Sequence, residues 1–315
     1  MATAPAALET RPDRPTVVAF AAVVLIGGTN FVAVSFSNRD LPPLYGAGLR
    51  FAIASLLFAV VIRWRGVPLP RGRSLVGTLV FGSLFTIANA LAYWALLSLP
   101  AGIGGVIFAA VPLLTLFLAV LHRLEPFRWR GAAGAVVTVA GIIVLLNAPL
   151  TVDVRVASAL GMLAAAVCAA EAGVVIKLYP PAHPAATNGT AMAVGAALLL
   201  GLSQVVDEPW SVPDVVTTWL AVLHLAVLGG VALLALYFFV LQRWTASGAS
   251  YQFVLMPIVT VLLAAWLAGE PLNASVIGGG LIVLAGVYVG ALSHGRRPRP
   301  TTTEQEAVTQ RCATP

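Results

Sequence analysis

An internal repeat constrains this chain more than any other feature of its sequence. The stretch that runs from Pro100 to Leu146 aligns without a gap with Thr245 to Ala291, at a constant offset of 145 positions. The identities at this offset include Phe108 with Phe253, Pro112 with Pro257, Thr115 with Thr260, Leu118 with Leu263, Ala119 with Ala264, Glu125-Pro126 with Glu270-Pro271, Gly134 with Gly279, and Ala140-Gly141 with Ala285-Gly286. Matched apolar residues mean little in a chain that is 59% hydrophobic, whereas matched Pro, Thr, Glu-Pro and Gly indicate a duplication. The chain is therefore predicted to contain two copies of one unit.

The low proportion of charged residues argues against an ordinary water-soluble domain. Only 10% of the 315 residues are charged, whereas a soluble domain carries about 25%, so the lipid bilayer is the predicted solvent. The two cysteines, Cys168 in an apolar run and Cys312 near the C-terminus, indicate no disulfide framework. The first apolar run is long and lacks a clear cleavage site, so we expect no signal peptide.

Ten apolar segments follow one another along the chain, and a helix needs about 20 such residues to cross a bilayer. They cover residues 16–36, 43–62, 75–97, 101–121, 129–147, 158–178, 187–206, 216–241, 247–268 and 274–293. The predicted fold class is therefore an all-α membrane protein with ten transmembrane helices. The predicted organisation is an N-terminal tail (1–15), a first five-helix repeat (16–147), a link (148–157), a second five-helix repeat (158–293) and a C-terminal tail (294–315).

The distribution of Lys and Arg predicts the orientation of these helices, because basic residues are enriched in cytoplasmic loops. With the N-terminus inside, only Arg39 and Arg155 fall outside and Arg50 falls within a helix, while the other basic residues lie inside. We therefore expect both termini in the cytoplasm and the protein in the cell (inner or plasma) membrane. Because each repeat has an odd number of helices, the second must be inverted relative to the first. Inverted repeats are typical of transporters that give alternating access to a site at the midplane.

Several short motifs resemble those of one transporter family. The stretch Ile26-Gly27-Gly28-Thr29-Asn30-Phe31-Val32-Ala33 resembles W-G-x-N-F, the first-helix motif of EamA-type members of the drug/metabolite transporter superfamily, although the aromatic residue is absent. Leu41-Pro42-Pro43 with Leu49-Arg50-Phe51 resembles the second helix of that family. The segments from Ala110 to Gly141 and from Met256 to Gly286 are similar to its fourth and fifth helices and their repeat. The resemblance implies a ten-helix, inverted-repeat carrier, often an exporter of amino acids or other small metabolites.

Two ionisable residues fall within predicted helices, where a charge costs on the order of 2.5–3.5 kcal/mol by insertion scales, so neither should face lipid. Glu171 lies on the cytoplasmic side of the centre of the sixth segment. A buried carboxylate there could couple transport to protons, could bind a substrate ammonium group, or could form a structural hydrogen bond to a neighbouring helix. We predict proton coupling for Glu171 and keep the structural alternative.

Arg50, the second of these residues, lies about a third of the way along the second segment, counted from its outer end. A helix rises about 1.5 Å per residue. The Arg50 guanidinium could hold a substrate carboxylate through two hydrogen bonds. Alternatively it could bond to backbone carbonyl groups or pair with Glu171, although the two differ in depth by roughly 10 Å. Arg50 is kept among the predicted substrate-binding residues.

Amides and aromatic side chains near mid-depth are the other candidates for a substrate pocket, because a few polar groups in an apolar cavity suit an amphipathic metabolite. The predicted substrate-binding residues besides Arg50 are Asn30, Asn89, Tyr93, Trp94, Tyr237, Tyr251 and Gln252. Asn89 and Tyr93 lie one turn apart and share a helix face. The structural alternatives are hydrogen bonds between helices and, for Trp94, an anchor at the membrane interface. A functional role is also open for the lone His224.

Pro112 and Pro257 form a symmetric pair that we predict to act as hinges. Each proline removes a helical hydrogen bond and bends its helix, which would serve a moving carrier or leave a static kink. Glu125-Pro126 and Glu270-Pro271 are interpreted as helix starts, with Pro in the first turn and an acid near the positive end of the helix dipole. Close helix packing is expected at the small residues Gly102, Gly104, Gly105, Ser247, Gly248 and Ser250.

Other classes of function find less support in the sequence. Gly248-Ala249-Ser250 faintly resembles the G-x-S-G of rhomboid-type intramembrane proteases, but the final Gly is absent, and neither H-E-x-x-H nor a Walker-type motif is present. A channel would need a polar lining along its whole pore, whereas polar residues are sparse in the apolar segments of this chain. A nucleotide-sugar or phosphate-ester carrier, the alternative within the superfamily, would need several cations at mid-depth, and Arg50 is the one candidate.

The chain is therefore predicted to be a secondary transporter, and not an enzyme, that exports small amphipathic metabolites such as amino acids by alternating access. The predicted partners are a small-molecule substrate and the lipid bilayer. No cofactor, metal or nucleic acid is expected, and the choice between a monomer and a homodimer stays open.

Overall fold

A computed structural model describes residues 12–124, 126–127, 129–146, 156–244 and 251–292, and these residues are helical with no strand. The elements are α1 (Arg14–Ser37), α2 (Pro43–Arg65), α3 (Arg73–Ala95), α4 (Ala101–Phe108), α5 (Val111–Leu121), α6 (Trp129–Leu146), α7 (Val156–Val175), η1 (Ile176–Leu178), α8 (Pro184–Val205), α9 (Val216–Leu223), η2 (His224–Ala232), α10 (Leu233–Arg243), α12 (Gln252–Ala268), α13 (Ala274–Val287) and η3 (Tyr288–Leu292). The predicted tails and link, together with Glu125, Ser247, Gly248 and Ser250, lie wholly or largely outside the described residues.

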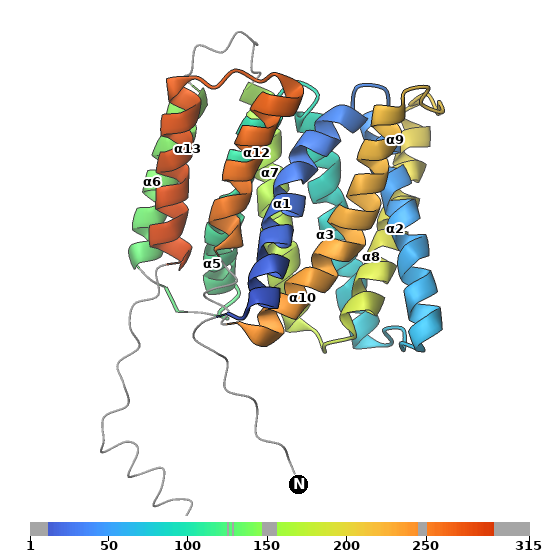
Figure 1. The fold of residues 1–315 in the computed structure, drawn as a ribbon. Helices are drawn as coiled ribbons and strands as arrows, with labels where there is room; N and C mark the ends of the chain where they lie inside the picture. Colours follow the sequence, from blue (N-terminus) through green and yellow to red (C-terminus); the bar gives the residue numbers. More distant parts are fainter. Residues whose placement is uncertain (1–11, 125, 128, 147–155, 245–250, 293–315) are drawn as a thin grey trace, which may run out of the picture.

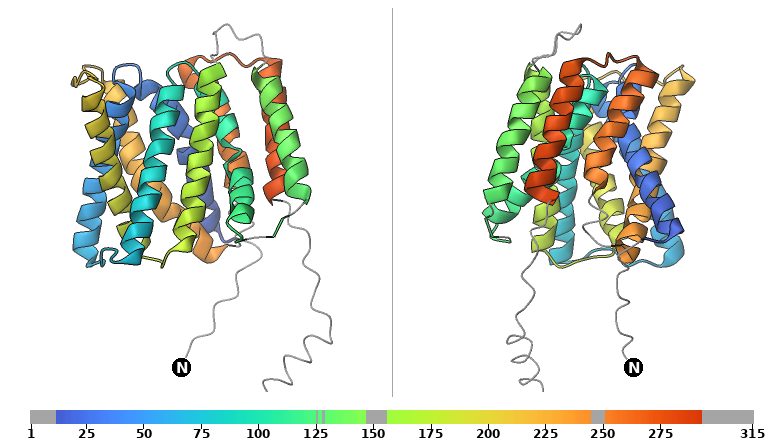
Figure 2. Two further views of the ribbon diagram at one scale, coloured as in Figure 1. Left: turned by 180° about the vertical axis from the view of Figure 1, so that it is seen from behind. Right: turned by 60° about the vertical axis from the view of Figure 1, so that its left-hand side comes forward.

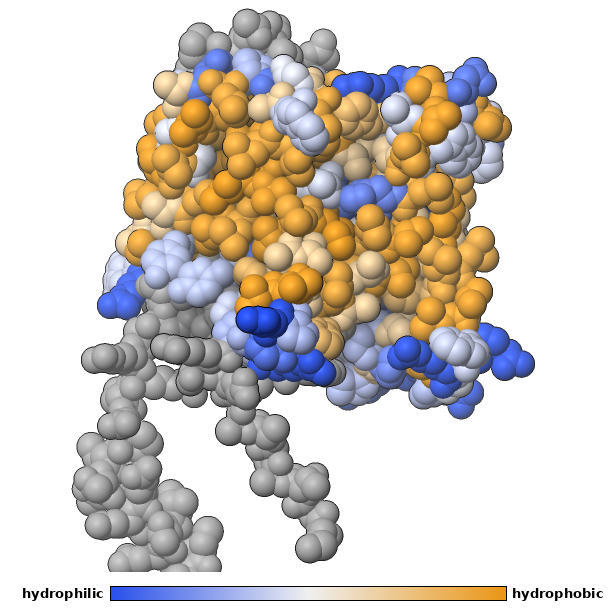
Figure 3. Space-filling model, viewed as in Figure 1, coloured by the Kyte–Doolittle hydropathy of each residue, from blue (hydrophilic) through white to orange (hydrophobic). Residues whose placement is uncertain are grey.

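The helices form a bundle whose visible face carries a broad apolar belt between two polar ends (Figure 3). Among the described residues, eight helical segments are long and apolar enough to cross a membrane. The last two predicted segments correspond to shorter apolar helices, Gln252–Ala268 and Ala274–Gly290. The predicted all-α membrane class is therefore confirmed, whereas ten complete spans stay a prediction.

The two ends of the bundle differ in charge. α1 begins and η3 ends on one side of the bundle, called here the proximal side; the distal side is the one where α1 ends at Ser37 (Figure 1). Most described basic residues belong to helix ends and loops of the proximal side: Arg14, Arg63, Arg65, Arg71, Arg73, Arg123, Arg130, Lys177 and Arg243. The structure thus separates the basic residues as the orientation prediction requires, although which side faces the cytoplasm stays a prediction.

The helices of the two repeat copies pack in a pattern that stays the same when the two copies are interchanged. α2 packs against α8 and α6 against α13, so each of these helices contacts its own counterpart, and α4 packs against α12, the counterpart of α5, which follows α4. α1 packs on α12 as α7 packs on α4 and α5, and α3 packs on α7 as α1 packs on α9, η2 and α10. This is the contact pattern expected of two related five-helix units joined about a two-fold axis.

The α6–α13 pair stands at one edge of the bundle (Figures 1 and 2) and is held together by glycines. A Cβ on Gly134 would lie 2.5 Å from the carbonyl oxygen of Gly286, and one on Gly279 would lie 2.7 Å from the backbone nitrogen of Leu145. Gly141 approaches the backbone of α13 just as closely. These are glycines that match across the repeat, so the duplication preserves a contact in which two helix backbones touch.

Two carboxylates on the distal side cap helices of the first copy. Glu270, between α12 and α13, accepts hydrogen bonds from Ala101 N at 2.6 Å and Gly102 N at 2.9 Å, at the start of α4. Glu208, after α8, accepts from two backbone N–H groups at the start of α2, at 3.2 and 2.8 Å. The interpretation of Glu270-Pro271 as a helix start needs correction, because α13 begins only at Ala274 and Glu270 caps another helix. The negative charge lies where the α4 dipole is positive.

Candidate functional site

A cavity of about 130 Å³ lies among α1, α2, α3, α4 and α7. Four predicted substrate-binding residues line it, namely Asn30, Arg50, Asn89 and Tyr93. Most of the remaining wall is apolar and includes Phe31, Phe85, Leu96, Phe108 and Ala169. Packing has therefore brought polar groups from three separate helices to one small, largely apolar space.

The Arg50 side chain is held at this cavity by the third helix. Its Nη2 donates a hydrogen bond to Oδ1 of Asn89 at 3.1 Å, and Nδ2 of Asn89 donates to the Phe85 carbonyl at 2.8 Å. The guanidinium carbon lies 5.7 Å from the centre of the Tyr93 ring, within the range of a cation–π attraction. Asn89 thus holds the guanidinium at the cavity, with the Phe51 and Tyr93 rings within cation–π range.

No carboxylate neutralises Arg50 within the part of the chain that the structure describes. The ion pairs there join His122 to Glu171 and Arg243 to Asp13, so the alternative pairing of Arg50 with Glu171 is not observed. An unpaired charge inside a membrane domain is costly. The adjacent cavity offers room for the anionic group of a ligand.

Two further polar atoms at the cavity lack partners. Asn30 Oδ1 and the Tyr93 hydroxyl are buried and form no hydrogen bond with the residues that the structure describes. The Tyr93 side chain is only 1% exposed, and although it interacts electrostatically with Arg50, its hydroxyl forms no hydrogen bond of ordinary geometry. Buried polar atoms are almost always hydrogen-bonded, so these two atoms indicate a site for a polar ligand.

The Asn30 region of α1 packs against η2, a segment with π-helical hydrogen bonding. His224, at the start of η2, places Nε2 2.8 Å from Oγ1 of Thr29. Gly229, within η2, lies directly beside the Asn30 amide. π-helical turns occur often at functional sites, and sequence periodicity did not predict this one because its residues are as apolar as those around it.

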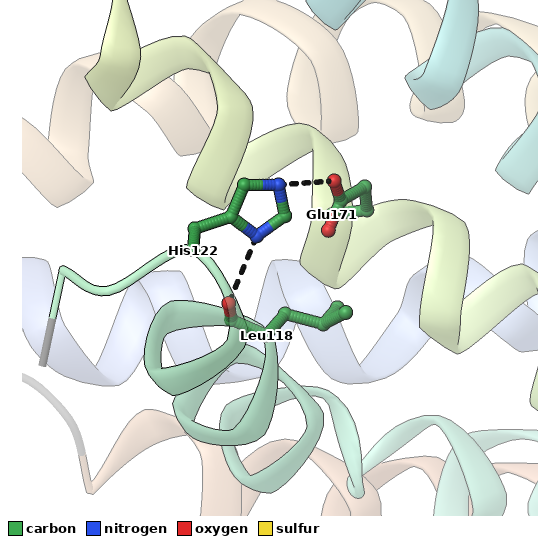
Figure 4. Close-up of polar contacts among 3 residues, drawn as sticks. All are labelled: Leu118, His122 and Glu171. Carbon is green, nitrogen blue, oxygen red and sulfur yellow. Dashed lines mark hydrogen bonds and ion pairs between the residues drawn. The ribbon is translucent and has the colours of Figure 1, made fainter. Parts of the chain in front are cut away.

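Glu171, the predicted proton-coupling residue, lies outside this cavity and pairs with a histidine that the sequence analysis did not select. Glu171 Oε1 is 3.1 Å from Nε2 of His122, the residue directly after α5, and Nδ1 of His122 is 2.9 Å from the Leu118 carbonyl oxygen (Figure 4). The second carboxylate oxygen of Glu171 is buried without a hydrogen-bond partner. A sequence signal existed, because His122 is a polar residue at the end of an apolar run where the other copy has Leu267.

The four other predicted substrate-binding residues lie away from the 130 Å³ cavity. Trp94 is 45% exposed and packs against α7. Tyr251 is 44% exposed and its ring stacks on that of Tyr288. Tyr237 and Gln252 form a side-chain hydrogen bond between α10 and α12. Substrate contacts by these residues therefore stay predictions.

The two predicted hinge prolines lie in different surroundings. α4 ends at Phe108 and α5 begins at Val111, so the helix is interrupted immediately before Pro112. α12 instead continues through Pro257. Because Phe108 lines the cavity, a bend at Pro112 would move the cavity wall, whereas the structure shows no break at Pro257. Both hinge roles stay predictions.

Comparison with known proteins identifies the family. A model of the EamA-like transporter family matches the chain twice, over residues 14–147 and 156–291. The chain belongs to this family. As an EamA-like transporter with many apolar helices, the protein is a multi-pass protein of the inner membrane, and its family is one of transporters rather than enzymes.

Relatives of this EamA-like chain span nearly its whole length. The uncharacterized inner membrane transporter YedA of Escherichia coli (strain K12) is 29% identical, and the match covers 87% of this chain and 90% of YedA. A probable amino-acid metabolite efflux pump of Salmonella typhimurium (strain LT2) is 24% identical, and the match covers 89% of this chain and 95% of the pump. One crystal structure, 23% identical, has a TM-score of 0.61 and covers 88% of this chain and 96% of that protein, which shows a shared fold.

Proposed function

We propose that this EamA-like protein exports small metabolites that carry a carboxylate group, amino acids foremost, across the inner membrane. One observation carries the proposal: the Arg50 guanidinium lies at the cavity and has no carboxylate partner among the described residues. A guanidinium can bind a carboxylate through two parallel hydrogen bonds.

The unpartnered atoms at the cavity favour a zwitterion. Oδ1 of Asn30 can accept a hydrogen bond from an ammonium group, and the Tyr93 hydroxyl can donate one to the carboxylate held by Arg50. The Salmonella typhimurium relative, a probable amino-acid metabolite efflux pump, supports the same class of substrate. An amino acid would therefore satisfy all three polar groups together.

The alternative, a carrier of nucleotide sugars or phosphate esters, has less support. Its substrates carry more negative charge, and Arg50 is the one cationic residue among those that line the described cavity. The volume of about 130 Å³ is also below the roughly 300–1,000 Å³ of pockets for drug-sized ligands. Both features favour a small monoanionic or zwitterionic solute.

Transport is proposed to occur by alternating access between two inverted repeats, with both termini in the cytoplasm. The exchange of contacts between the copies supports this arrangement. The gathering of basic residues on the proximal side supports the orientation, because such residues are retained in the cytoplasm.

The test uses purified full-length protein in proteoliposomes and measures counterflow of labelled amino acids, cationic drugs and nucleotide sugars. We expect amino-acid counterflow by the wild type and by Arg39→Gln, a control at an exposed arginine whose guanidinium lies over the Phe36 ring. Arg50→Gln should lower counterflow at least tenfold, because a hydrogen bond to a charged group contributes about 1.5–3 kcal/mol. Transport of nucleotide sugars without amino acids would contradict the proposal.

A further inference from the structure

The hydrogen bonds of His122 indicate which of its ring nitrogens carries a hydrogen atom. The imidazole lies between two oxygen atoms: the Leu118 carbonyl oxygen, 2.9 Å from Nδ1, and Oε1 of Glu171, 3.1 Å from Nε2 (Figure 4). A backbone carbonyl oxygen can only accept a hydrogen bond, so Nδ1 must carry a hydrogen atom. A neutral imidazole with its hydrogen on Nδ1 has a bare lone pair on Nε2.

That bare lone pair would face the lone pairs of an ionised carboxylate. Two acceptors 3.1 Å apart repel unless a proton lies between them. The observed contact therefore requires one proton more than a neutral His122 and an ionised Glu171 hold together. This proton belongs either to an imidazolium or to a carboxylic acid.

We propose that the His122–Glu171 pair is the proton site of this transporter, closed when loaded with one proton and open when the proton has left. The pair joins α5 of the first copy to α7 of the second, so its closure is coupled to the relative position of the two copies. The protonation step rests on the local geometry alone. Its use in driving export rests on the proposed function.

The position of the pair suits proton exchange with water on the proximal side. The side chains of His122 and Glu171 are 26% and 23% exposed, so both are partly shielded and yet reachable. His122 follows the last residue of α5, at the proximal end of that helix. Phe108, which lines the cavity, is the last residue of α4 and lies near the middle of the α4–α5 segment. Movement of this segment would therefore connect the proton site to the cavity.

Within the described structure, no other charged residue forms an ion pair with His122 or Glu171. α7 packs against α3, α4, α5 and η1. On these elements and next to His122, the other charged residues are Arg73, Arg123 and Lys177, and none of them forms an ion pair with Glu171. On α7 itself, Cys168 lies three residues before Glu171, on the same face of the helix. The geometry therefore assigns the neutralisation of the Glu171 carboxylate to the proton that it shares with His122.

The first experiment determines the protonation state of His122 and does not depend on transport. Full-length protein with ¹⁵N-labelled histidine is placed in lipid nanodiscs, and the His122 ring nitrogens are observed by NMR at pH 7.5, where about nine-tenths of free imidazole is neutral. The signals are assigned with His122→Asn, and exposed His183 serves as an internal reference. We expect hydrogen on Nδ1 and a proton shared between Nε2 and Glu171. A neutral ring with hydrogen on Nε2 and a bare Nδ1 would overturn the proposal.

Glu171→Gln provides the matched variant for this measurement. The glutamine amide can donate a hydrogen bond to a bare Nε2, so the pair should close without the additional proton and His122 should become the neutral Nδ1–H form. Retention of the additional proton at His122 in Glu171→Gln would show that the carboxylate does not share it, and would also overturn the proposal.

The second experiment connects the proton to transport in proteoliposomes. For wild type and for the control His183→Asn, we expect an inward-directed proton gradient to accelerate export of labelled amino acids several-fold. Glu171→Gln should retain amino-acid counterflow but lose the acceleration. Acceleration that is equal in wild type and Glu171→Gln would overturn the coupling role. Absence of amino-acid counterflow in the wild type would instead contradict the proposed substrate, while the NMR result would still decide the protonation step.

Discussion

Gly229 of η2 lies so close to Asn30 of α1 that a Cβ at position 229 would be 2.5 Å from Oδ1 of Asn30. The next glycine has more room, since the nearest atom to a Cβ on Gly230 would be 3.4 Å away. We expect Gly229→Ala to displace the Asn30 amide from the cavity and to raise KM for amino acids roughly tenfold, the cost of one hydrogen bond to a charged group. Gly230→Ala is the control. The same KM for both variants in proteoliposomes would contradict a role for Asn30 in binding.

The hydrogen bond between Arg50 and Asn89 allows a sharper test of the cation. Asn89→Asp would place a carboxylate beside the guanidinium and supply internally the anion that we assign to the substrate. We expect at least a tenfold loss of amino-acid binding, because the substrate must displace a charge-assisted bond. Asn89→Leu should be less harmful, since it leaves Arg50 without a competing anion. If Asn89→Asp transported amino acids as well as Asn89→Leu, Arg50 would not bind the carboxylate.

Stability should depend on the glycine contact between α6 and α13. A Cβ on Gly279 would lie 2.7 Å from the backbone nitrogen of Leu145, whereas one on Gly278 meets nothing within 4 Å. Gly279→Ala should destabilise the protein by about 1–3 kcal/mol through overpacking. Gly278→Ala should be neutral or stabilise it by up to about 1 kcal/mol, because Ala is the better helix former. Denaturation in detergent, followed by circular dichroism, measures the difference; equal stability would show that α6 and α13 separate easily.

The cap that Glu270 provides to α4 predicts a dependence of stability on pH. Burial raises the pKa of the Glu270 carboxyl above its ordinary value of 4.5, and the hydrogen bonds from Gly102 and Ala101 oppose this shift. A carboxyl with a raised native pKa stabilises the fold most below its unfolded pKa, and that contribution is lost as the pH rises through the native pKa. The stability of the wild type relative to Glu270→Gln should therefore fall from about pH 4.5 upward.

Thermal unfolding of both proteins between pH 4 and pH 7 measures this difference. Glu270→Gln retains one acceptor for the two N–H groups at the start of α4, so it should also lose about 1 kcal/mol of capping. Glu208→Gln, at the cap of α2, is the matched variant for the capping contribution. A difference between wild type and Glu270→Gln that grew as the pH rose would show that the hydrogen bonds outweigh burial.

Much of the architecture could be predicted because it depends on local sequence. The second apolar segment, predicted at 43–62, is α2 at Pro43–Arg65, with Pro at the first helical position and Gly66 in the left-handed conformation after the last. Repeated glycines such as Gly134 and Gly279 also proved informative, because only a residue without a side chain fits where two helix backbones touch. Helix interruptions were predicted less well: both prolines suggested a bend, but only the helix before Pro112 is broken.

The candidate site could be predicted only in part. Asn30, Arg50, Asn89 and Tyr93 were selected because polar residues in apolar segments are rare, and the structure brings these four to one cavity. The same criterion also selected Tyr237 and Gln252, which hydrogen-bond to each other instead. It did not select His122, which lies at a helix end where polar residues are common. Rarity within a segment thus identifies candidates but does not show which of them meet.

The sequence by itself determined the class of this protein: an apolar, duplicated, all-helical chain of the inner membrane. Composition, segment length and the spacing of Pro and Gly act within one helix or between repeated positions, so they can be recognised without coordinates. Only the tertiary structure decided that Arg50 has no carboxylate partner among the described residues, that Gly229 adjoins Asn30, and that Glu171 pairs with His122. Each of these relationships joins residues on different helices, and the rotation and depth of packed helices are set by the fit of all their side chains together.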